Sequence, residues 1–440
     1  MNSAPLKTAA AAAVVLLVAA SAHFLYFARA KDFFYPDSFT YLTPARYLVK
    51  GMGFVFDEDV AETIRTPGYP LILAGAIRAK VTAQGVVAGQ HLLSILVALG
   101  AYIWAFVATR SRPVALMAGL ISGTDLLSVH YANKILTETV FTAGLFIVVL
   151  MALRTLRSAE DAPFIAPLLG LLCGGLVLVR PAALLYSVVL AVVFLFCLPK
   201  ARVRITTVFL ICALVLPATW AFRNYDRTGV FVVSSLEGTN LLMFRAAGAL
   251  AMEEQGGFRE AMAVHQAALL ERANTILRSR YGIDPDDLPH AVASRVYTEV
   301  AESVIAHHPA AYARLVLRGI GHNLFESDWQ AVGVVSSFSA DVLKPIFDGW
   351  NALIVLISAA GLISLWKRDR EAGVLLLLTI GYFIVIAAGG ESEGRFRTPV
   401  IPEIAFAAAV GMGAVTRHVA ALSLRVLPKS FRNPRELPVS

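Results

Sequence analysis

Long apolar runs alternate with short polar connections along most of this chain of 440 residues. A helix needs about 20 predominantly apolar residues to cross a bilayer, so each run of that length predicts a membrane-spanning helix. On this criterion we expect about ten spans. They are Thr8–Ala28, Val86–Thr109, Pro113–Tyr131, Glu138–Leu153, Ala162–Val179, Ala182–Leu198, Val203–Ala221, Ile346–Trp366, Val374–Ala388 and Val400–Val415.

The first of these runs has two interpretations. Lys7 precedes it and Ala20-Ser21-Ala22 could serve as a cleavage site, as in a secretory signal peptide. The apolar stretch is longer than the about 7–15 residues usual for such a peptide, which favours an uncleaved span.

Two polar connections are much longer than the others. Arg29–Gly85 is rich in aromatic residues and interrupted by Pro and Gly, whereas Phe222–Pro345 holds much of the chain's charge. The pattern of the second predicts helices near Glu253–Tyr281, Asp286–His308 and Pro309–Phe325, and Pro309 suits a first helical position. We therefore expect an all-α polytopic membrane protein. Its parts are a membrane domain 1–221 with a first outer loop 29–85, a mostly helical outer segment 222–345, a second membrane part 346–417 and a basic tail 418–440.

Composition excludes several classes of protein. Apolar residues make up 57% of the chain and charged residues 16%, and the mean hydropathy is +0.67. A soluble globular protein has about 25% charged residues. A soluble enzyme, a disordered chain and a secreted disulfide scaffold are therefore excluded. Cys173, Cys197 and Cys212 all lie in apolar runs and form neither a zinc-binding nor a redox motif.

The chain carries 38 Lys and Arg residues against 31 Asp and Glu residues, a net charge of +7. With a cytoplasmic N-terminus and alternating spans, basic residues gather in the short inner loops and the tail, as the positive-inside rule requires. These are Arg110, Arg112, Arg154, Arg157, Lys200, Arg202, Arg204, Lys367, Arg368, Arg370, Arg417, Arg425, Lys429, Arg432 and Arg435. We expect a multi-pass protein of the inner (cytoplasmic) membrane with both termini in the cytoplasm. The surplus charge then marks orientation, and no nucleic-acid partner is expected.

Polar groups that could carry chemistry lie at the outer ends of the spans. Ionisable groups at the centre of a membrane helix cost about 2.5–3.5 kcal/mol, so those near lipid usually have a partner or a role. Asp37 follows the first span by a few residues and lies among aromatic residues. Partial desolvation there is expected to raise its pKa, which suits a general base. Alternatively, Asp37 caps a helix that runs through Tyr47.

Motifs along the chain resemble those of a known superfamily. Tyr35-Pro36-Asp37-Ser38, then Gly51-Met52-Gly53-Phe54, then Arg65-Thr66-Pro67-Gly68-Tyr69-Pro70-Leu71 resembles the first outer loop of GT-C glycosyltransferases. The similarity is greatest to the bacterial glycosyltransferase family 39 group, relatives of protein O-mannosyltransferases and lipid A aminoarabinose transferases. Later matches are His130-Tyr131, Leu136-Thr137-Glu138, Leu178-Val179-Arg180-Pro181, Trp220-Ala221-Phe222-Arg223-Asn224-Tyr225 and Glu393-Gly394-Arg395-Phe396-Arg397-Thr398-Pro399.

The resemblance implies roles for particular residues. Asp37 corresponds to the catalytic base of the family, and Ser38 stands where many members have a second acidic residue. The implied donor-phosphate ligands are Arg65, Arg180, Arg395 and Arg397. The implied substrate-positioning residues are Tyr41, Tyr69, Glu138, Asn224 and Glu393.

Ordinary structural roles remain open for several of these side chains. Arg180 and Arg397 could be interfacial anchors whose head groups reach water. Arg223, which also falls on the outer side, could pair with Glu237. Glu138 could be an acidic residue that favours the N-terminal end of a helix dipole.

Together these features predict a membrane glycosyltransferase. It would move a sugar from a polyprenyl-phosphate donor to a hydroxyl of a glycan, glycolipid or protein acceptor at the outer face of the cytoplasmic membrane. One base and no nucleophile implies inversion at the anomeric carbon. We expect membrane lipid as a further partner and no cofactor. We also expect no metal, because metal-binding motifs are missing from the sequence. A glycan polymerase or ligase, or a lipid-linked glycan flippase, is the alternative. Neither the sugar nor the acceptor follows from the sequence.

Overall fold

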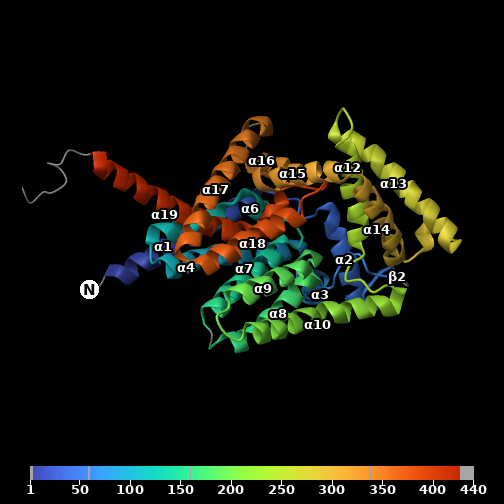
Figure 1. The fold of residues 1–440 in the computed structure, drawn as a ribbon, viewed down its shortest axis with the longest axis horizontal. Coiled ribbons are helices and arrows are strands. Elements are labelled where there is room, and N and C mark those ends of the chain that lie inside the picture. The colour runs from blue at the N-terminus through green and yellow to red at the C-terminus, as the bar shows by residue number, and fades with distance from the viewer. Residues whose placement is uncertain (1–2, 58–59, 159, 336–338, 427–440) are drawn as a thin grey trace, which may run out of the picture.

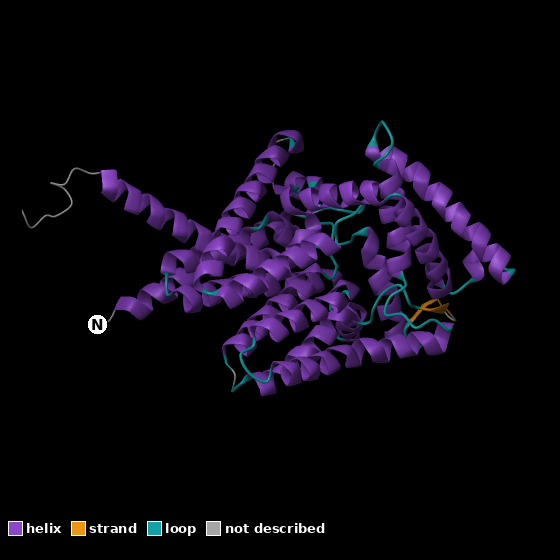
Figure 2. Ribbon diagram, in the orientation of Figure 1, coloured by secondary structure: helices purple, strands orange, loops and turns teal. Residues whose placement is uncertain are grey.

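The computed structural model of the chain describes residues 3–57, 60–158, 160–335 and 339–426. Helices dominate these residues, and one small antiparallel sheet pairs β1 (Val55–Asp57) with β2 (Val60–Ala61). Figure 2 shows this sheet at the end of the molecule opposite the N-terminus. The described part of the chain is thus the all-α membrane architecture that the apolar runs predict.

Each predicted span falls on helix. Among the described residues, seven helices are long and apolar enough to cross a membrane, or eight if the bent pair α5 and α6 is one span. The two remaining runs fall on the shorter helices α9 and α18. The elements are α1 (Ser3–Arg29), α4 (Ala83–Thr109), α5 (Arg112–Thr124), α6 (Leu126–Ala132), α7 (Glu138–Arg157), α8 (Ala162–Val179), η1 (Pro181–Ala183), α9 (Leu184–Cys197), α10 (Arg202–Thr228), α17 (Ala340–Arg368), α18 (Arg370–Ile386), η4 (Gly394–Val400) and α19 (Ile401–Val426).

Small residues let neighbouring membrane helices approach closely. A Cβ on Gly170 of α8 would meet the Phe209 carbonyl oxygen of α10, and a Cβ on Gly361 of α17 would meet the Ala407 carbonyl oxygen of α19. Such contacts suit membrane helices, whose association depends on van der Waals packing more than on expulsion of water. They produce one continuous apolar core that runs through the bundle.

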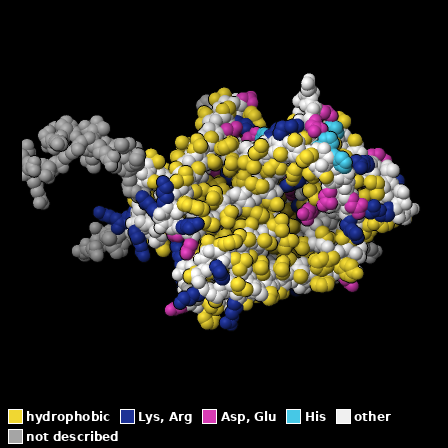
Figure 3. All heavy atoms as spheres, in the orientation of Figure 1, with side chains coloured by type: hydrophobic (Ala, Val, Ile, Leu, Met, Phe, Trp, Pro, Cys, Tyr) yellow, Lys and Arg dark blue, Asp and Glu magenta, His cyan; other side chains and the backbone are white. Residues whose placement is uncertain are grey.

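The two ends of the bundle differ. The start of α1 and the far end of α19 both lie at the left of Figure 1, and Lys and Arg side chains gather at that end in Figure 3. The side chains of Lys429, Arg432 and Arg435, and of Arg417 and Arg425, lie outside what the structure describes. The opposite end carries both long connections.

The first of these connections folds against the bundle end. It contains α2 (Pro36–Val49), the β1–β2 hairpin and α3 (Gly68–Arg78). Gly51 and Gly53 adopt φ values of +79° and +87°, which suit glycine and let the chain turn from α2 into β1. Helices α2 and α3 pack together, and the rings of Tyr41 and Tyr69 meet edge to face at 5.4 Å.

The second connection forms a helical layer with a core of its own. Its elements are α11 (Leu236–Asn240), the π-helical η2 (Leu241–Ala246), α12 (Ala247–Ala251), α13 (Phe258–Tyr281), η3 (Pro285–Asp287), α14 (His290–His307), α15 (Pro309–Phe325) and α16 (Trp329–Val335). Helix α15 begins at Pro309 and ends at Phe325, which confirms the predicted bounds. In Figure 1 the helices α13 and α14 lie at the right-hand end, beyond α2.

Candidate active site

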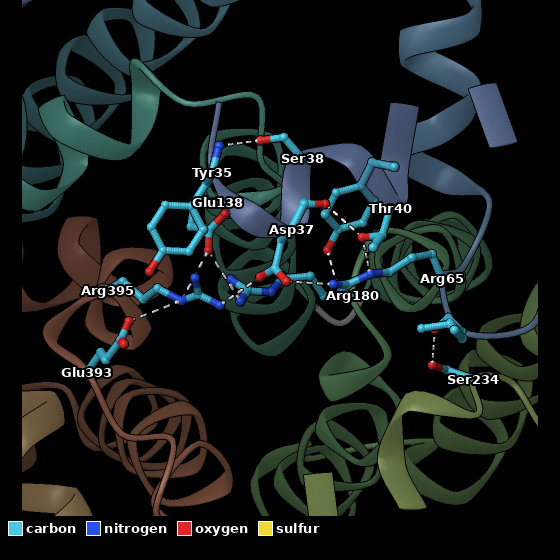
Figure 4. Close-up of polar contacts among 12 residues, drawn as sticks. Tyr35, Asp37, Ser38, Thr40, Arg65, Glu138, Arg180, Ser234, Glu393 and Arg395 are labelled. Atoms are coloured by element: carbon cyan, nitrogen blue, oxygen red, sulfur yellow. Dashed lines mark hydrogen bonds and ion pairs between the residues drawn. The ribbon is translucent and has the colours of Figure 1, made fainter. Parts of the chain in front are cut away.

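Asp37 occupies the first turn of α2 without capping it. The backbone N–H of Tyr35, which precedes the helix, donates to Ser38 Oγ at 2.9 Å. Ser38 therefore stabilises this helix start, as a hydroxyl commonly does. The alternative prediction was that Asp37 caps the helix, and in the structure it does not. Its carboxylate points instead toward two arginines from distant parts of the chain (Figure 4).

Both carboxylate oxygens of Asp37 are engaged. Arg65 Nη2 donates to Oδ1 at 2.8 Å, and Arg395 Nη2 donates to Oδ2 at 3.2 Å. Arg65 follows the β1–β2 hairpin, whereas Arg395 lies in η4, just before α19. Charge-assisted hydrogen bonds of this kind are roughly twice as strong as neutral ones. Asp37 therefore joins the first long connection (residues 29–85) to the C-terminal part of the membrane domain.

Arg65 is held by three side-chain contacts. Besides its bond to Asp37, it donates from Nε to Thr40 Oγ1 at 2.8 Å and from Nη1 to the Tyr41 hydroxyl at 3.1 Å. Its guanidinium carbon also lies 4.6 Å from the centroid of the Tyr41 ring. Thr40 and Tyr41 both belong to α2, the helix that also carries Asp37. These contacts therefore hold the Arg65 side chain against the same helix as the acid.

The backbone that carries Arg65 is itself fixed by a buried carboxylate. Glu62 Oε1 accepts from the N–H groups of Ile64 at 2.5 Å and Arg65 at 2.9 Å. Only 1% of Glu62 is exposed. Burial raises the pKa of this carboxyl, although the two backbone bonds and the charges of Arg65 and Arg223 oppose that shift.

Residues beyond the seventh predicted span hold the same loop from the other side. Arg223 Nη1 donates to the Glu62 carbonyl at 2.7 Å, and Nη2 donates to the Phe54 carbonyl. Ser234 Oγ donates to the Ile64 carbonyl at 2.6 Å. Arg223 thus makes backbone contacts rather than the pair with Glu237 that the sequence left open.

A second carboxylate lies behind Asp37. Glu138 begins α7, is 3% exposed, and its Oε1 lies 3.5 Å from Arg180 Nη2 and 3.9 Å from Arg395 Nε. Arg180 directly follows α8 and points inward to this carboxylate, so it is not a side chain that reaches out to water. A buried ion requires such partners, because removal from water costs several kcal/mol per ion.

The electrostatics of Asp37 differ from the expectation. Burial alone would raise the pKa of Asp37, but the charges and hydrogen bonds of Arg65 and Arg395 outweigh burial and hold the pKa below its ordinary value. The predicted rise is therefore wrong for this arrangement. Glu393, which lies 3.8 Å from Arg395 Nε, shows the opposite balance, because burial raises its pKa more than Arg395 lowers it.

The structure brings most of the predicted site residues together. The cluster consists of Asp37, Tyr41, Arg65, Glu138, Arg180, Glu393 and Arg395. Two others serve the scaffold instead: the Tyr69 hydroxyl donates to Gln90 Oε1 at 2.6 Å, and Asn224 Nδ2 donates to the Val232 carbonyl at 2.8 Å.

Arg397 requires a correction. Its side chain is 2% exposed, and Nη1 donates to the carbonyls of Asn323 and Leu324 at 3.2 and 2.6 Å. These carbonyls lie at the C-terminal end of α15, where helix carbonyls lack intrahelical partners. Arg397 therefore caps α15 and does not join the cluster, although it lies only two residues from Arg395.

Sequence reasoning missed several residues of the site. Thr40 and Glu62 hold Arg65, and the Tyr35 ring centroid lies 5.2 Å from the guanidinium carbon of Arg395. Tyr35 belongs to the Tyr-Pro-Asp-Ser motif and Thr40 follows that motif by two residues, and this proximity was the only available signal for them. Glu62 gave no signal, because one acidic residue in a polar loop has no distinctive pattern. Within the described residues, no three His, Cys, Asp or Glu side chains are placed to hold a metal ion together.

Comparison with known proteins places this geometry in a known fold. No protein-family model matches the chain, and no curated protein sequence matches it. Among solved structures, the apo oligosaccharyltransferase of Archaeoglobus fulgidus matches with a TM-score of 0.53 and 12% identity over 97% of this chain and 53% of that one. The same enzyme, AglB, in complex with an inhibitory peptide and a dolichol-phosphate matches with a TM-score of 0.50 and 12% identity over 98% of this chain and 53% of that one. The chain shares the fold of this archaeal oligosaccharyltransferase.

This likeness has a limited extent. The chain spans about half the length of the archaeal oligosaccharyltransferase that it matches. ArnT of Cupriavidus metallidurans bound to undecaprenyl phosphate is a more distant match, with a TM-score of 0.37 and 13% identity over 95% of this chain and 81% of that one. At such identities, the likeness concerns the fold of the polypeptide.

Proposed function

We propose that the chain is a membrane glycosyltransferase that takes a sugar from a polyprenyl-phosphate donor. The observation that supports this most directly is the carboxylate of Asp37 between Arg65 and Arg395, with Arg180 behind, at one end of the membrane helices. A base beside several arginines at one end of the membrane helices suits chemistry on a lipid phosphate. The shared fold is consistent with this proposal.

The arginines have a clear chemical use in such a reaction. When the bond between sugar and phosphate breaks, the leaving lipid phosphate gains negative charge. Guanidinium groups aimed at that charge in a partly buried site stabilise the transition state. Arg65, Arg180 and Arg395 supply three positive charges against the carboxylates of Asp37, Glu138 and Glu393, of which the side chain of Glu393 is half exposed. The three guanidinium groups thus already have acidic partners, which a donor phosphate would have to share or displace.

The reaction proceeds as a single displacement. The acceptor hydroxyl gives its proton to Asp37 while its oxygen forms a bond to the anomeric carbon. The bond between that carbon and the phosphate oxygen breaks, and its electron pair stays on the phosphate. Because one carboxylate acts and no enzyme nucleophile intervenes, the configuration at the anomeric carbon inverts.

The same proposal covers location and partners. The basic end of the bundle faces the cytoplasm, so the Asp37 cluster faces the outer side of the cytoplasmic membrane. The donor is a sugar on a polyprenyl phosphate, and the acceptor is a glycan, a glycolipid or a protein. The archaeal oligosaccharyltransferase of similar fold was solved with a dolichol-phosphate, a lipid phosphate of the same chemical type.

Two measurements on the purified chain test this function. Native mass spectrometry should detect binding of undecaprenyl phosphate but not of undecaprenol, and Arg180→Ala should weaken that binding. Arg278→Ala, which breaks an exposed ion pair with Glu271, is the matched control and should bind as the wild type does.

Transfer is then assayed from a panel of undecaprenyl-phosphate sugars into cell-envelope acceptors. Asp37→Asn should lower the rate by about 10²–10⁴-fold, the usual contribution of a general base. A chain that binds no lipid phosphate would contradict the proposal. Transport of the lipid without transfer, unchanged by Asp37→Asn, would favour a flippase.

A further inference from the structure

We propose that the donor phosphate displaces Asp37 from Arg395, while Arg65 keeps its hold on Asp37. Asp37 would then be released to act as a base only when the donor is bound. This inference rests on the proposed function. It gives different roles to two arginines that the sequence analysis placed together as phosphate ligands: Arg395 binds the phosphate and Arg65 orients Asp37.

The first argument is one of space. In an inverting displacement, the acceptor hydroxyl and the leaving phosphate lie on opposite faces of the sugar, with the base on the acceptor's side. Inverting glycosidases keep their two carboxyl groups about 6.5–9.5 Å apart for a comparable reason. Here, Arg65 and Arg395 contact the two oxygens of Asp37 at 2.8 and 3.2 Å. Each oxygen keeps a free lone pair, but an arginine on both of them crowds the carboxylate, and the release of one arginine opens an approach for the acceptor hydroxyl.

The second argument is that the two arginines are fixed by different numbers of hydrogen bonds. Arg65 makes three side-chain hydrogen bonds, to Asp37, Thr40 and Tyr41, and its backbone N–H is held by Glu62. Arg395 makes one side-chain hydrogen bond, the longer one to Asp37. Separating Arg65 from Asp37 would disturb a set of contacts within the first outer loop. Separating Arg395 from Asp37 breaks one hydrogen bond and leaves Arg395 near the carboxylates of Glu138 and Glu393.

The third argument is the unused hydrogen-bonding capacity of Arg395. Its buried Nε has no hydrogen-bond partner among the described residues. The neighbouring carboxylates of Glu138 and Glu393 lie 3.9 and 3.8 Å away, beyond hydrogen-bond distance. A buried donor without a partner is unfavourable, so a phosphate oxygen that reached Nε and Nη2 together would satisfy both.

The consequence is an order of events. Without donor, both oxygens of Asp37 are engaged and the carboxylate is a weak base. When the phosphate takes Arg395, Oδ2 is released and Asp37 loses one of the two charges that hold its proton affinity down. Arg65 keeps the carboxylate oriented through Oδ1. The acceptor hydroxyl then meets a base that is stronger than in the free protein.

The test uses binding of undecaprenyl phosphate, measured on purified full-length protein by native mass spectrometry. If Asp37 competes with the phosphate, then Asp37→Asn should bind undecaprenyl phosphate more tightly than the wild type, by about tenfold, since a charged competitor is replaced by a neutral one. Asp32→Asn is the matched control. It removes the same charge from the same connection, where Asp32 pairs with Lys134 at 2.9 Å, and it should leave the affinity unchanged.

A double-mutant cycle separates the two arginines. The gain from Asp37→Asn should disappear in an Arg395→Ala background and persist in an Arg65→Ala background. A cycle also excludes a general effect of charge, because only coupled residues give a non-additive result. Equal affinity of wild type and Asp37→Asn, or a gain that persists without Arg395, would overturn the inference.

A structure of the wild type with undecaprenyl phosphate gives a second readout that needs no variant. The Arg395–Asp37 pair should be open and the Arg65–Asp37 pair closed. If both pairs stay closed around a bound lipid, the inference is wrong while the proposed function stands. If no protein in the series prefers undecaprenyl phosphate to undecaprenol, the proposed function itself fails.

Discussion

Gly68 lies directly against the backbone of Leu178. A Cβ at position 68 would lie 2.6 Å from the Leu178 carbonyl oxygen, a separation that real Cβ atoms essentially never show. Gly68 follows Arg65 by three residues, and Leu178 precedes Arg180 by two. The close contact between α3 and the end of α8 therefore sets the distance between two arginines of the candidate site.

Gly68→Ala should weaken both stability and donor binding. The new methyl group must push α3 away from the backbone of α8, and overpacking of this kind costs about 1–3 kcal/mol. The shift also moves Arg65 relative to Arg180, so the affinity for undecaprenyl phosphate should fall. Thermal unfolding in detergent and native mass spectrometry measure the two effects.

The same helix offers a matched control. A Cβ on Gly75 of α3 would have no atom within 4 Å. Gly75→Ala should therefore be neutral or should stabilise the protein by about 0.5–1 kcal/mol, because alanine favours a helix interior. Equal losses in the two variants would show that an added methyl group is harmful at either glycine of α3, and would contradict the role given to the Leu178 contact.

Arg397→Gln should reduce stability without changing donor binding. The guanidinium bonds to carbonyls at the end of α15, and leaving such buried acceptors unpaired costs about 1–3 kcal/mol each. The Asp37 cluster does not include this side chain. The unfolding temperature should therefore fall, while the affinity for undecaprenyl phosphate, measured on the folded protein, should stay unchanged. A large loss of affinity at unchanged stability would restore Arg397 as a phosphate ligand.

The pH dependence of stability should report on Glu62. Its pKa is raised in the folded protein by burial, so the folded state binds this proton more tightly than the unfolded chain does. Protonation therefore adds stability, which is full below the ordinary carboxyl pKa and lost as pH rises through the raised value.

Glu62→Gln keeps an acceptor for the two backbone N–H groups and removes the titration. The wild type should gain stability relative to this variant as the pH falls from neutrality toward the ordinary carboxyl pKa. Unfolding temperatures of both proteins across this range test the prediction. A difference that stays constant with pH would contradict it, and the other titrating groups cancel in the comparison.

The membrane helices could be predicted because their physical signal is local. A run of apolar residues long enough to span a bilayer is sufficient, and all ten predicted runs fall on helix. The break at Asp125 between α5 and α6 was not predicted. The Asp125 side chain accepts a hydrogen bond from the backbone N–H of Ser128 and caps the start of α6. Helix α6 then runs at 47° to α5. A single polar residue inside an apolar run does not reveal such a bend.

The site could be predicted only as far as motifs reach. The sequence identified Asp37 and its arginines, but not that Arg65 and Arg395 meet the same carboxylate from positions 28 and 358 residues away. The expected rise in the pKa of Asp37 was wrong for this reason, because its aromatic neighbours are visible in the sequence and its ion pairs are not. Arg395 and Arg397 separate because a tight 3₁₀ turn directs residues two apart to different sides.

Kinetics as a function of pH should reveal the release of Asp37. Asp37 must be unprotonated to act as a base, and in the free protein its pKa lies below the ordinary value because of Arg65 and Arg395, despite its burial. The acid limb of kcat/KM, which reports on the free enzyme, should therefore lie below about pH 4. When the donor takes Arg395, the pKa of Asp37 rises, and the acid limb of kcat, which reports on the bound enzyme, should move to higher pH. Initial rates with saturating and with limiting donor measure the two limbs. Limbs that coincide, or a kcat limb at lower pH, would show that Asp37 keeps both arginines throughout the reaction.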